Sequence, residues 1–475
     1  MFSFRTLLLL RLLEAVLLRT SFNPDEHWQA NEVAHSLAFG DTVSPKALLT
    51  WEWLEPAEIR GWAHPMIFAG LFKLLAIVGL DSRWLVAWSP RCLQAVIAAS
   101  GDVAIGKLGG SAAQWLQMTN WFMAFCLPRT YSNSLECVLF TWCLVVYMVR
   151  KDGVGTFILA ALTLLMRPTA AVMFVPIGVH HLFVRKARLL DIIYGAVVYL
   201  FLTLLVDRIG YGHFVFVPWN FFKFNYLQNV SALYGTHPFL WYFYAGMPFM
   251  LGPHLVPLLL AVTNKATMKR HSLLIVIFLF STLVFSLNSH KEFRFLLPLM
   301  PIAFVIMADK ASRLRLWFAR VMIMGNIGMF AFFGLIHQAG PEAVMTELAR
   351  IQPRSVLFLM DCHQTAFAAH LHGIGVQWLR QLDCSPTSPK PHESTRFSTD
   401  PVTFTNEFLA GLNEAPSHIV AFEDRKGNEL GPLLEKLGYK TQSVHSHILP
   451  ILGDERAMII LEKTDPESLV DAPVV

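Results

Sequence analysis

Charged residues are scarce in this chain. Of its 475 residues only 15% are Asp, Glu, Lys or Arg, whereas 54% are hydrophobic and the mean hydropathy is +0.47. A soluble domain carries about a quarter charged residues, so the composition excludes a soluble globular protein and indicates an integral membrane protein. The formal net charge of +4 is too small to suggest a nucleic-acid partner.

Several familiar motifs are also missing. The sequence has no phosphate-binding GxxxxGK[ST] loop, no His or Cys cluster with zinc-ligand spacing and no internal repeat of fixed period. The first apolar stretch lacks a small-residue cleavage site, and it holds Arg11 and Glu14, which are spaced to pair on one helical face. We therefore expect an uncleaved first span. We expect no cofactor and assign no metal ligands, and the sequence does not show whether a divalent ion assists.

Apolar runs long enough to cross a membrane recur through the first two thirds of the chain. A crossing needs roughly 17 to 25 apolar residues, and we expect spans near 4–22, 84–106, 112–128, 133–149, 153–167, 168–184, 189–206, 239–262, 272–289, 293–308 and 315–336. The pair Arg167-Pro168 predicts a tight turn or broken helices between two of them. Basic residues cluster in alternate connections, which the positive-inside rule places in the cytosol.

The segment 65–80 is apolar but shorter than a crossing requires, and it is more typical of an in-plane helix. Residues 23–83 then form one luminal loop. The predicted fold is a polytopic α-helical membrane protein with about eleven transmembrane helices and a cytosolic N-terminus. Its two domains are a transmembrane part, 1–336, and a luminal α/β module, 337–475, with strands at 355–360, 419–422 and 458–461, a helix at 430–437 and a surface loop at 386–401.

Two further features agree with this orientation. The sequon Asn229-Val230-Ser231 lies in a predicted luminal loop, where it predicts N-glycosylation. Four of the six cysteines fall in apolar spans, whereas Cys362 and Cys384 fall in the tail. In an oxidising compartment these two could form a disulfide, and two free buried thiols are the alternative.

The string Asn23-Pro24-Asp25-Glu26-His27-Trp28-Gln29 directly follows the first span. Adjacent carboxylates at a bilayer face are costly to desolvate, so we interpret them as a general base held at the membrane surface. The alternative is a solvated helix cap, because Asn-Pro-Asp-Glu is also a good helix start.

A second charged string, His290-Lys291-Glu292-Phe293-Arg294, ends the ninth predicted span. Three potential cations within five residues form a site for an anion such as a phosphate. The alternative is a set of snorkelling anchors with one Lys–Glu or Arg–Glu pair. An acidic base and a phosphate site on one luminal face would suit transfer of a sugar from a polyprenyl phosphate to a hydroxyl acceptor.

These motifs resemble the luminal GT-C mannosyltransferases that use dolichyl-phosphate mannose. The resemblance rests on the first-loop string with Leu49-Thr50-Trp51-Glu52-Trp53, on the segment 129–136 and on the segment 290–295. The segments 234–238, 358–365 and 382–386 resemble the branch that adds the third mannose to the glycosylphosphatidylinositol (GPI) anchor. The resemblance covers almost the whole chain.

The resemblance implies the roles of individual residues. Asp25 would be the catalytic base, supported by Glu26, and His290, Lys291 and Arg294 would face the dolichyl phosphate. The implied substrate site also contains Arg129, His27, Trp28, Gln29, His64 and His237. The implied partners are dolichyl-phosphate mannose, the dimannosyl GPI precursor and the endoplasmic reticulum bilayer, and the implied reaction is an inverting α-1,2 transfer.

Two other functions compete with this interpretation. A sister enzyme that acts on the lipid-linked oligosaccharide precursor of N-glycans would share the first-loop and His-Lys-Glu motifs. A transporter or flippase would instead place ionisable residues near the middle of its spans, in discontinuous helices of repeated halves. Here the strong charges lie at span ends, and no repeated halves are found.

Overall fold

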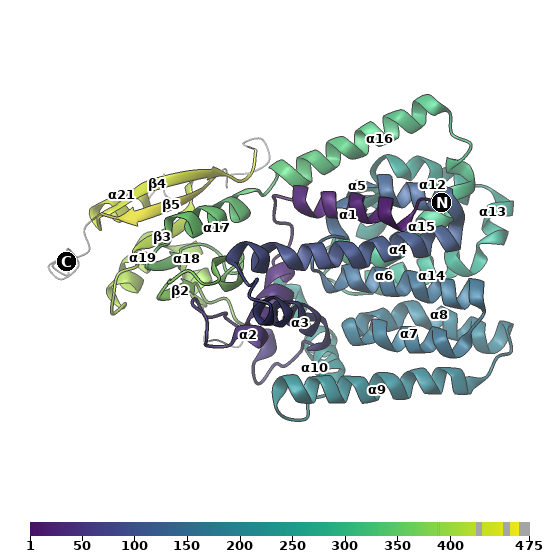
Figure 1. Cartoon of the computed structure of the whole chain (residues 1–475), viewed down its shortest axis with the longest axis horizontal. Helices are drawn as coiled ribbons and strands as arrows, with labels where there is room; N and C mark the ends of the chain where they lie inside the picture. Colours follow the sequence, from purple (N-terminus) through teal and green to yellow (C-terminus); the bar gives the residue numbers. More distant parts are fainter. Residues whose placement is uncertain (387, 389, 424–429, 450–456, 465–475) are drawn as a thin grey trace. The chain divides into compact units, whose positions relative to one another are not determined.

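The computed structural model describes residues 1–386, 388, 390–423, 430–449 and 457–464 (Figure 1). The chain divides into two compact units. The first contains Met1–Leu17, Pro56–His64 and Arg91–Ala331, and the second contains Leu18–Glu55, Pro65–Pro90 and Phe332–Val475. The first loop after α1 thus belongs mainly to the same unit as the C-terminal tail.

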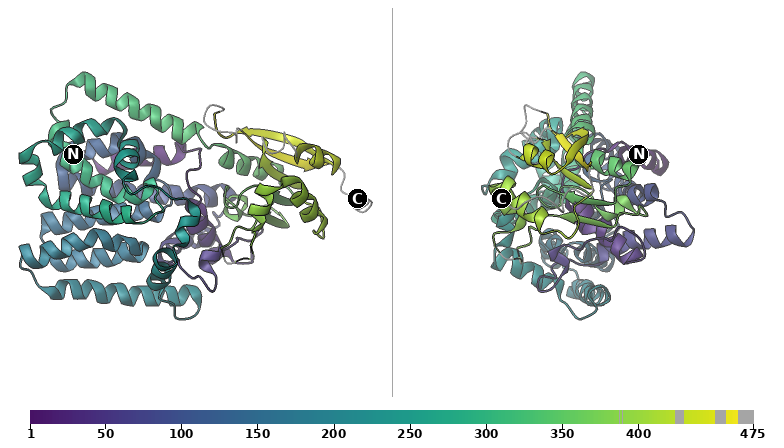
Figure 2. Two further views of the ribbon diagram at one scale, coloured as in Figure 1. Left: turned by 180° about the vertical axis from the view of Figure 1, so that it is seen from behind. Right: turned by 90° about the vertical axis from the view of Figure 1, so that its left-hand side faces the viewer.

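The regular secondary structure described in the first unit is helical. Its helices are α1 (Phe4–Leu17), α4 (Arg83–Thr119, which begins in the second unit), α5 (Trp121–Cys126), α6 (Ser132–Val145), η3 (Val146–Arg150), α7 (Gly153–Met166), η4 (Pro168–Ala170), α8 (Ala171–Val179), η5 (His180–Val184), α9 (Leu189–Tyr211), α10 (Val217–Phe222), η6 (Lys223–Leu227), η7 (Val230–Tyr234), η8 (Tyr242–Gly246), α11 (Met247–Leu251), η9 (Gly252–His254), α12 (Leu255–Val262), α13 (Lys265–Arg270), α14 (Ser272–Leu287), η10 (Phe293–Leu299), α15 (Met300–Ala311) and α16 (Leu316–Ala331). Helix α7 packs against both α6 and α9 (Figures 1 and 2).

Five helices of the described chain are long and apolar enough to cross a membrane: Arg83–Thr119, Ser132–Arg150, Leu189–Tyr211, Tyr242–Val262 and Leu316–Ile336. Shorter apolar helices accompany them at Ala63–Ile77, Gly153–Met166, Pro168–Val184 and Ser272–Leu287. The predicted polytopic helical fold is confirmed, although several of the expected spans are interrupted.

The breaks in the helices have local causes. Arg167 is extended at φ −150° and ψ 114° ahead of Pro168, so α7 ends at Met166 as expected. The span expected at 112–128 is wrong as a continuous helix. Helix α4 runs on to Thr119 with non-helical geometry at Gly110, and Asn120 starts α5 by accepting a hydrogen bond from the Met123 backbone N–H.

A buried ionic cluster joins α1 to α4 within the first unit. The guanidinium of Arg11 binds Asp102 through two nitrogens at 2.8 Å each, and its Nη1 lies 2.7 Å from Glu14 Oε2. Gln117 donates a hydrogen bond to the same Asp102 carboxylate at 2.7 Å. The predicted Arg11–Glu14 pair is confirmed, but the sequence did not indicate that Asp102 would complete it.

The second unit combines the first loop with an α/β module. Its elements are η1 (His27–Asn31), α2 (Glu32–Phe39), η2 (Trp51–Trp53), α3 (Ala63–Ile77, whose first two residues lie in the first unit), η11 (Phe332–Ile336), α17 (Gly340–Ile351), β1 (Ser355–Phe358), η12 (Ala368–Leu371), β2 (Trp378–Gln381), α18 (Glu393–Thr399), α19 (Pro401–Ala410), β3 (His418–Phe422), α21 (Gly431–Lys436), β4 (Tyr439–Ser446) and β5 (Ala457–Lys463). Helix α18 replaces much of the surface loop expected at 386–401, so that expectation is wrong there.

The five strands form one mixed sheet in the order β2-β1-β3-β5-β4. Strand β1 is parallel to β2 and β3, whereas β5 is antiparallel to β3 and β4. Side chains alternate between the faces: Val356 and Phe358 join a core with α17, and Leu357 and Leu359 join one that includes Phe397 and Phe404 of α18 and α19. Both faces are covered, which explains why the central strands read as continuous apolar runs.

Candidate functional site

The acidic pair lies at the start of the first-loop helix. The backbone N–H of Asp25 donates to Asn23 Oδ1 at 3.0 Å, and the carbonyl of Pro24 accepts hydrogen bonds from His27 and Trp28, both at 3.0 Å. The Asn-Pro-Asp-Glu string therefore does begin a helix. However, Asp25 is only half-exposed and Glu26 is buried, so the two carboxylates do not form a freely solvated cap.

The three residues that follow the acidic pair point into the protein. Within the second unit, Nε2 of His27 lies 3.8 Å from Glu342 Oε1 at the start of α17. The Trp28 indole N–H donates to the carbonyl of Thr365 at 2.9 Å, and the Gln29 amide donates to Glu52 Oε2 at 3.2 Å. These contacts place the first-loop helix against the tail segment 363–372, a pairing that the motifs alone did not reveal.

Glu32 strengthens the same contact, and the sequence analysis missed it. Its carboxylate accepts the backbone N–H groups of Phe367 at 3.0 Å and Ala369 at 3.3 Å. Complete burial raises the pKa of Glu32 to about 7, although His370 and these N–H groups act to lower it. The available signal was spacing, because Glu32 lies one helical turn after Trp28 on the same face.

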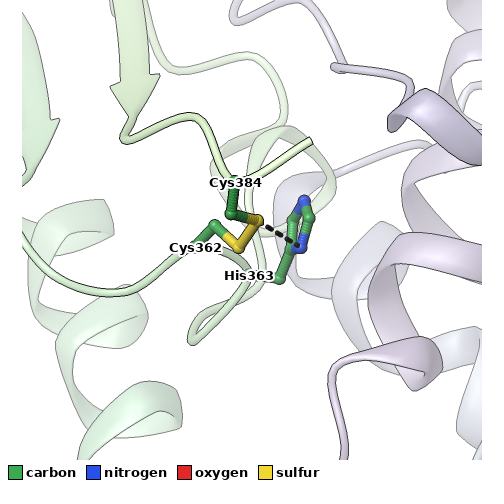
Figure 3. A group of neighbouring side chains, drawn as sticks. All are labelled: Cys362, His363 and Cys384. Atoms are coloured by element: carbon green, nitrogen blue, oxygen red, sulfur yellow. Dashed lines mark hydrogen bonds between the residues drawn. A yellow bond between two sulfur atoms is a disulfide. The ribbon is translucent and has the colours of Figure 1, made fainter. Parts of the chain in front are cut away.

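The tail segment that receives the helix is anchored by a disulfide. Cys362 and Cys384 are joined, with their Cα atoms 6.1 Å apart. Between the disulfide and the first-loop helix lies His363, whose ring is 4.7 Å from that of Trp28 (Figure 3). The side chains of Cys362, His363 and Cys384 have their potential ligand atoms close together, but disulfide sulfurs are not the thiolates that bind metals.

The second charged string lies in the first unit, between α14 and η10. Glu292 binds Arg294 through two contacts, of 2.6 Å and 2.9 Å, and its Oε1 lies 3.0 Å from His290 Nε2. The Arg–Glu pair that was expected here as the alternative to a phosphate site is therefore present. Lys291 donates to the backbone carbonyls of His237, at 3.0 Å, and Asn288.

The charges of this string influence one another. Burial would raise the pKa of Glu292, but Arg294 and the hydrogen bonds from His290 and Arg294 lower it well below its usual range. Burial acts to lower the pKa of His290, yet the hydrogen bond and charge of Glu292 raise it overall. With His290 protonated, three cations and one carboxylate leave a net charge of about +2 here.

Of the remaining predicted residues of the first unit, His237 touches the charged string, because its carbonyl accepts the hydrogen bond from Lys291 and its backbone N–H donates to the Ser289 carbonyl at 2.9 Å. Arg129 is fully buried, with Nε donating to the Phe125 carbonyl at 3.1 Å. His64 is buried near the start of α3, and the ring of His237 stacks on Trp241 at 4.4 Å. Asn229 is exposed in a left-handed conformation at φ 52°. The sequence did not predict the pair between Arg167 Nε and Glu136 Oε2, which are 3.1 Å apart.

Two solved structures have a similar fold. ArnT from Cupriavidus metallidurans bound to undecaprenyl phosphate matches with a TM-score of 0.57 at 12% identity, covering 99% of this chain and 98% of the ArnT chain. Its apo state matches with a TM-score of 0.54, covering 97% of both chains. The chain therefore has the same fold as ArnT, the GT-C fold.

Sequence similarity assigns the chain to a narrower group than the fold does. Residues 2–372 match the model of the Alg9-like mannosyltransferase family. Mannosyltransferase APTG1 of Arabidopsis thaliana is 36% identical, covering 87% of this chain and 83% of the relative. GPI alpha-1,2-mannosyltransferase 3 of Danio rerio is 34% identical (93% and 86% coverage), and that of Homo sapiens is 33% identical (92% and 83%).

The chain belongs to the Alg9-like mannosyltransferase family. It is a multi-pass membrane glycosyltransferase, as the motifs predicted, and the competing interpretation as a transporter or flippase is excluded.

Proposed function

We propose that this enzyme transfers the third mannose of the GPI anchor. The donor would be dolichyl-phosphate mannose, and the acceptor would be the dimannosyl GPI precursor at the luminal face of the endoplasmic reticulum. The observation that carries the proposal is the similarity, over 92–93% of this chain, to relatives named GPI alpha-1,2-mannosyltransferase 3. The proposed reaction uses no cofactor, because the lipid-linked donor is itself a substrate.

Asp25 is the proposed general base. A base must come within hydrogen-bond reach of the hydroxyl that it deprotonates. Asp25 is partly exposed, whereas Glu26 is buried, and this difference favours Asp25. The acceptor oxygen bonds to the anomeric carbon, its proton passes to Asp25, and the bond between the anomeric carbon and the phosphate oxygen breaks. The β-linked mannose of the donor thereby becomes an α-1,2-linked mannose.

His290, Lys291 and Arg294 are the proposed phosphate site. The departing dolichyl phosphate gains negative charge as the bond breaks, and fixed cations stabilise such charge. The Glu292 carboxylate holds Arg294 and His290 in place, and it keeps His290 protonated to higher pH than an ordinary histidine. We place this string, the first loop and the C-terminal module in the lumen and the N-terminus in the cytosol.

Complementation of cells that lack the third GPI mannosyltransferase tests the proposal. We expect the wild-type chain to restore surface GPI-anchored proteins and to remove the accumulated dimannosyl precursor. Asp25→Asn should fail at equal expression, because loss of a general base costs about 10²- to 10⁴-fold in rate. Asp41→Asn is the matched control, since this exposed first-loop carboxylate pairs only at the surface with Lys46.

Two outcomes would contradict the proposal. Failure of a well-expressed wild-type chain would reject the GPI acceptor and favour the sister enzyme of the oligosaccharide pathway, which a strain lacking that enzyme would reveal. Rescue by Asp25→Asn would leave the reaction in place and remove Asp25 as its base.

A further inference from the structure

His363 is a tail residue whose ring packs against Trp28, three residues after the proposed base. Burial lowers the pKa of His363 to about 4, although the carboxylates of Asp25 and Asp383 act to raise it. The geometric link to Asp25 is Trp28, which lies three residues after Asp25 in the first-loop helix and whose ring is 4.7 Å from that of His363. At neutral pH the imidazole is uncharged, so it is suited to hydrogen bonding with a neutral group rather than to binding a phosphate.

The backbone of His363 is held in an unfavourable conformation. Its φ of 64° lies in the left-handed region, which residues with a side chain rarely adopt. Two restraints maintain it: the neighbouring Cys362 is tied to Cys384, and the His363 N–H donates to the Gln381 side chain at 2.9 Å. Such conformations persist where surrounding structure enforces them, and they concentrate at functional sites.

The orientation of the ring is fixed as well. The ring packs against Trp28 at an interplanar angle of 58°, and Trp28 is itself held by its hydrogen bond to the Thr365 carbonyl. Nδ1 lies 3.9 Å from the Cys384 sulfur, as the dashed line in Figure 3 shows. A disulfide sulfur carries no proton, so this contact favours the tautomer with hydrogen on Nδ1. In the described part of the chain, Nε2 has no hydrogen-bond partner, and in this tautomer it carries an unshared electron pair.

We propose that His363 is an acceptor-binding residue, whose Nε2 accepts a hydrogen bond from a hydroxyl of the acceptor sugar beside Asp25. The inference rests on the function proposed above and names the residue that orients its acceptor. The disulfide and Trp28 hold the ring in position. The C-terminal module thereby contributes directly to acceptor recognition.

His363 suits a hydroxyl of the acceptor rather than a group of the donor. In an inverting transfer, the incoming oxygen and the departing phosphate lie on opposite faces of the anomeric carbon, and the base contacts the incoming oxygen. A neutral hydrogen-bonding group beside the base is therefore on the acceptor side. A site built for a sugar hydroxyl also discriminates strongly against molecules that lack this hydroxyl.

Steady-state transfer by the full-length chain in microsomes tests the proposal, with dolichyl-phosphate mannose and a dimannosyl GPI acceptor varied separately. We expect His363→Ala and His363→Phe to raise KM for the acceptor about tenfold, the loss of one hydrogen bond, with KM for the donor unchanged. His363→Gln should recover part of the loss, because its amide oxygen is an acceptor at similar reach. His445→Phe on β4, at the opposite edge of the sheet from β2, is the control.

His363→Phe makes the test decisive, because it keeps a ring on Trp28 and removes both nitrogens. A wild-type acceptor KM in this variant would show that the ring only packs, and it would overturn the proposal, as would a rise in donor KM alone. A wild-type chain that used only an oligosaccharide acceptor would overturn the proposed function instead. The same variants measured with that acceptor would then show whether His363 binds it.

Discussion

Glu32 is a carboxylate that the fold holds without contact with water. Its raised pKa of about 7 means that the folded protein binds the proton more tightly than the unfolded chain does. Its contribution to stability is therefore fully present below about pH 4.5 and is lost as the pH rises to about 7, and the loss is of order 3 kcal/mol.

The upward direction of this pKa shift predicts how the stability of the Glu32→Gln variant depends on pH. Glutamine stays neutral and still accepts the Phe367 and Ala369 N–H groups, so the variant should not lose this stability between pH 5 and 7.5. The thermal midpoint of the full chain in detergent measures this effect. As the pH rises, the midpoint of the variant should increase relative to that of the wild type. Parallel curves, like those expected for the exposed Glu407→Gln, would contradict the account.

Glu292 connects the charge of the phosphate site to pH. Because Glu292 raises the pKa of His290, Glu292→Gln should allow His290 to lose its proton at lower pH. If protonated His290 helps to bind the donor phosphate, the alkaline limb of kcat/KM for the donor will shift to lower pH. Asp309→Asn, which removes a carboxylate from an exposed ion pair with Arg270, is the control. An unmoved limb in Glu292→Gln would remove His290 from the phosphate site.

At the scale of single elements, the α1–α4 contact depends on a buried charge cluster. Arg11→Leu would leave Asp102 and Glu14 buried without their cation, which costs about 3–5 kcal/mol. We expect a marked fall in the thermal midpoint of the solubilised chain, whereas Arg5→Leu on the exposed face of α1 should change little.

A triple variant of the same cluster tests whether the loss of stability comes from the two carboxylates left without their cation. The triple variant Arg11→Leu, Glu14→Leu and Asp102→Leu removes every charge together, and an apolar replacement of a buried ion group is often tolerated. It should recover much of the stability that Arg11→Leu loses. A triple variant less stable than the single one would show that the cluster stabilises the fold beyond satisfying its own charges.

The elements also show what sequence patterns can and cannot predict. Strands β1, β3 and β5 were predicted because they are buried and apolar. Strands β2 and β4 were not, because they lie at the sheet edges, where most of their side chains are partly or fully exposed, and β4 is largely polar. Helix α18 lies in a segment rich in Ser and Thr, where tertiary packing of Phe397 outweighs weak local propensity.

The site was predictable only in part, for a similar reason. The string from Asp25 to Gln29 stands out because polar residues beside an apolar span are unusual. Its partners could not be foreseen, since the Trp28–Thr365 hydrogen bond joins residues 337 positions apart, and only the fold brings them together. The pairing of Glu292 with Arg294 is local, and it was the alternative to an open phosphate site.

At the scale of the whole molecule, the orientation in the membrane is the feature to establish. Asn229 is exposed in the structure, and in the luminal orientation its sequon should carry one N-glycan. We expect a glycosidase-sensitive size shift that Asn229→Gln abolishes. Ala266→Ser creates a sequon at Asn264, in the connection with Lys265, Lys269 and Arg270 that the positive-inside rule places in the cytosol, and it should add no glycan. The opposite pattern would invert the proposed topology.

The central claim is mannose transfer to a GPI acceptor by this chain, and its most direct test is the purified full-length protein with labelled dolichyl-phosphate mannose and the dimannosyl GPI precursor. The account predicts a trimannosyl product whose label is released by an α-1,2-specific mannosidase, and almost none with Asp25→Asn. A wild-type protein that leaves this acceptor unchanged but mannosylates the lipid-linked oligosaccharide precursor would contradict it.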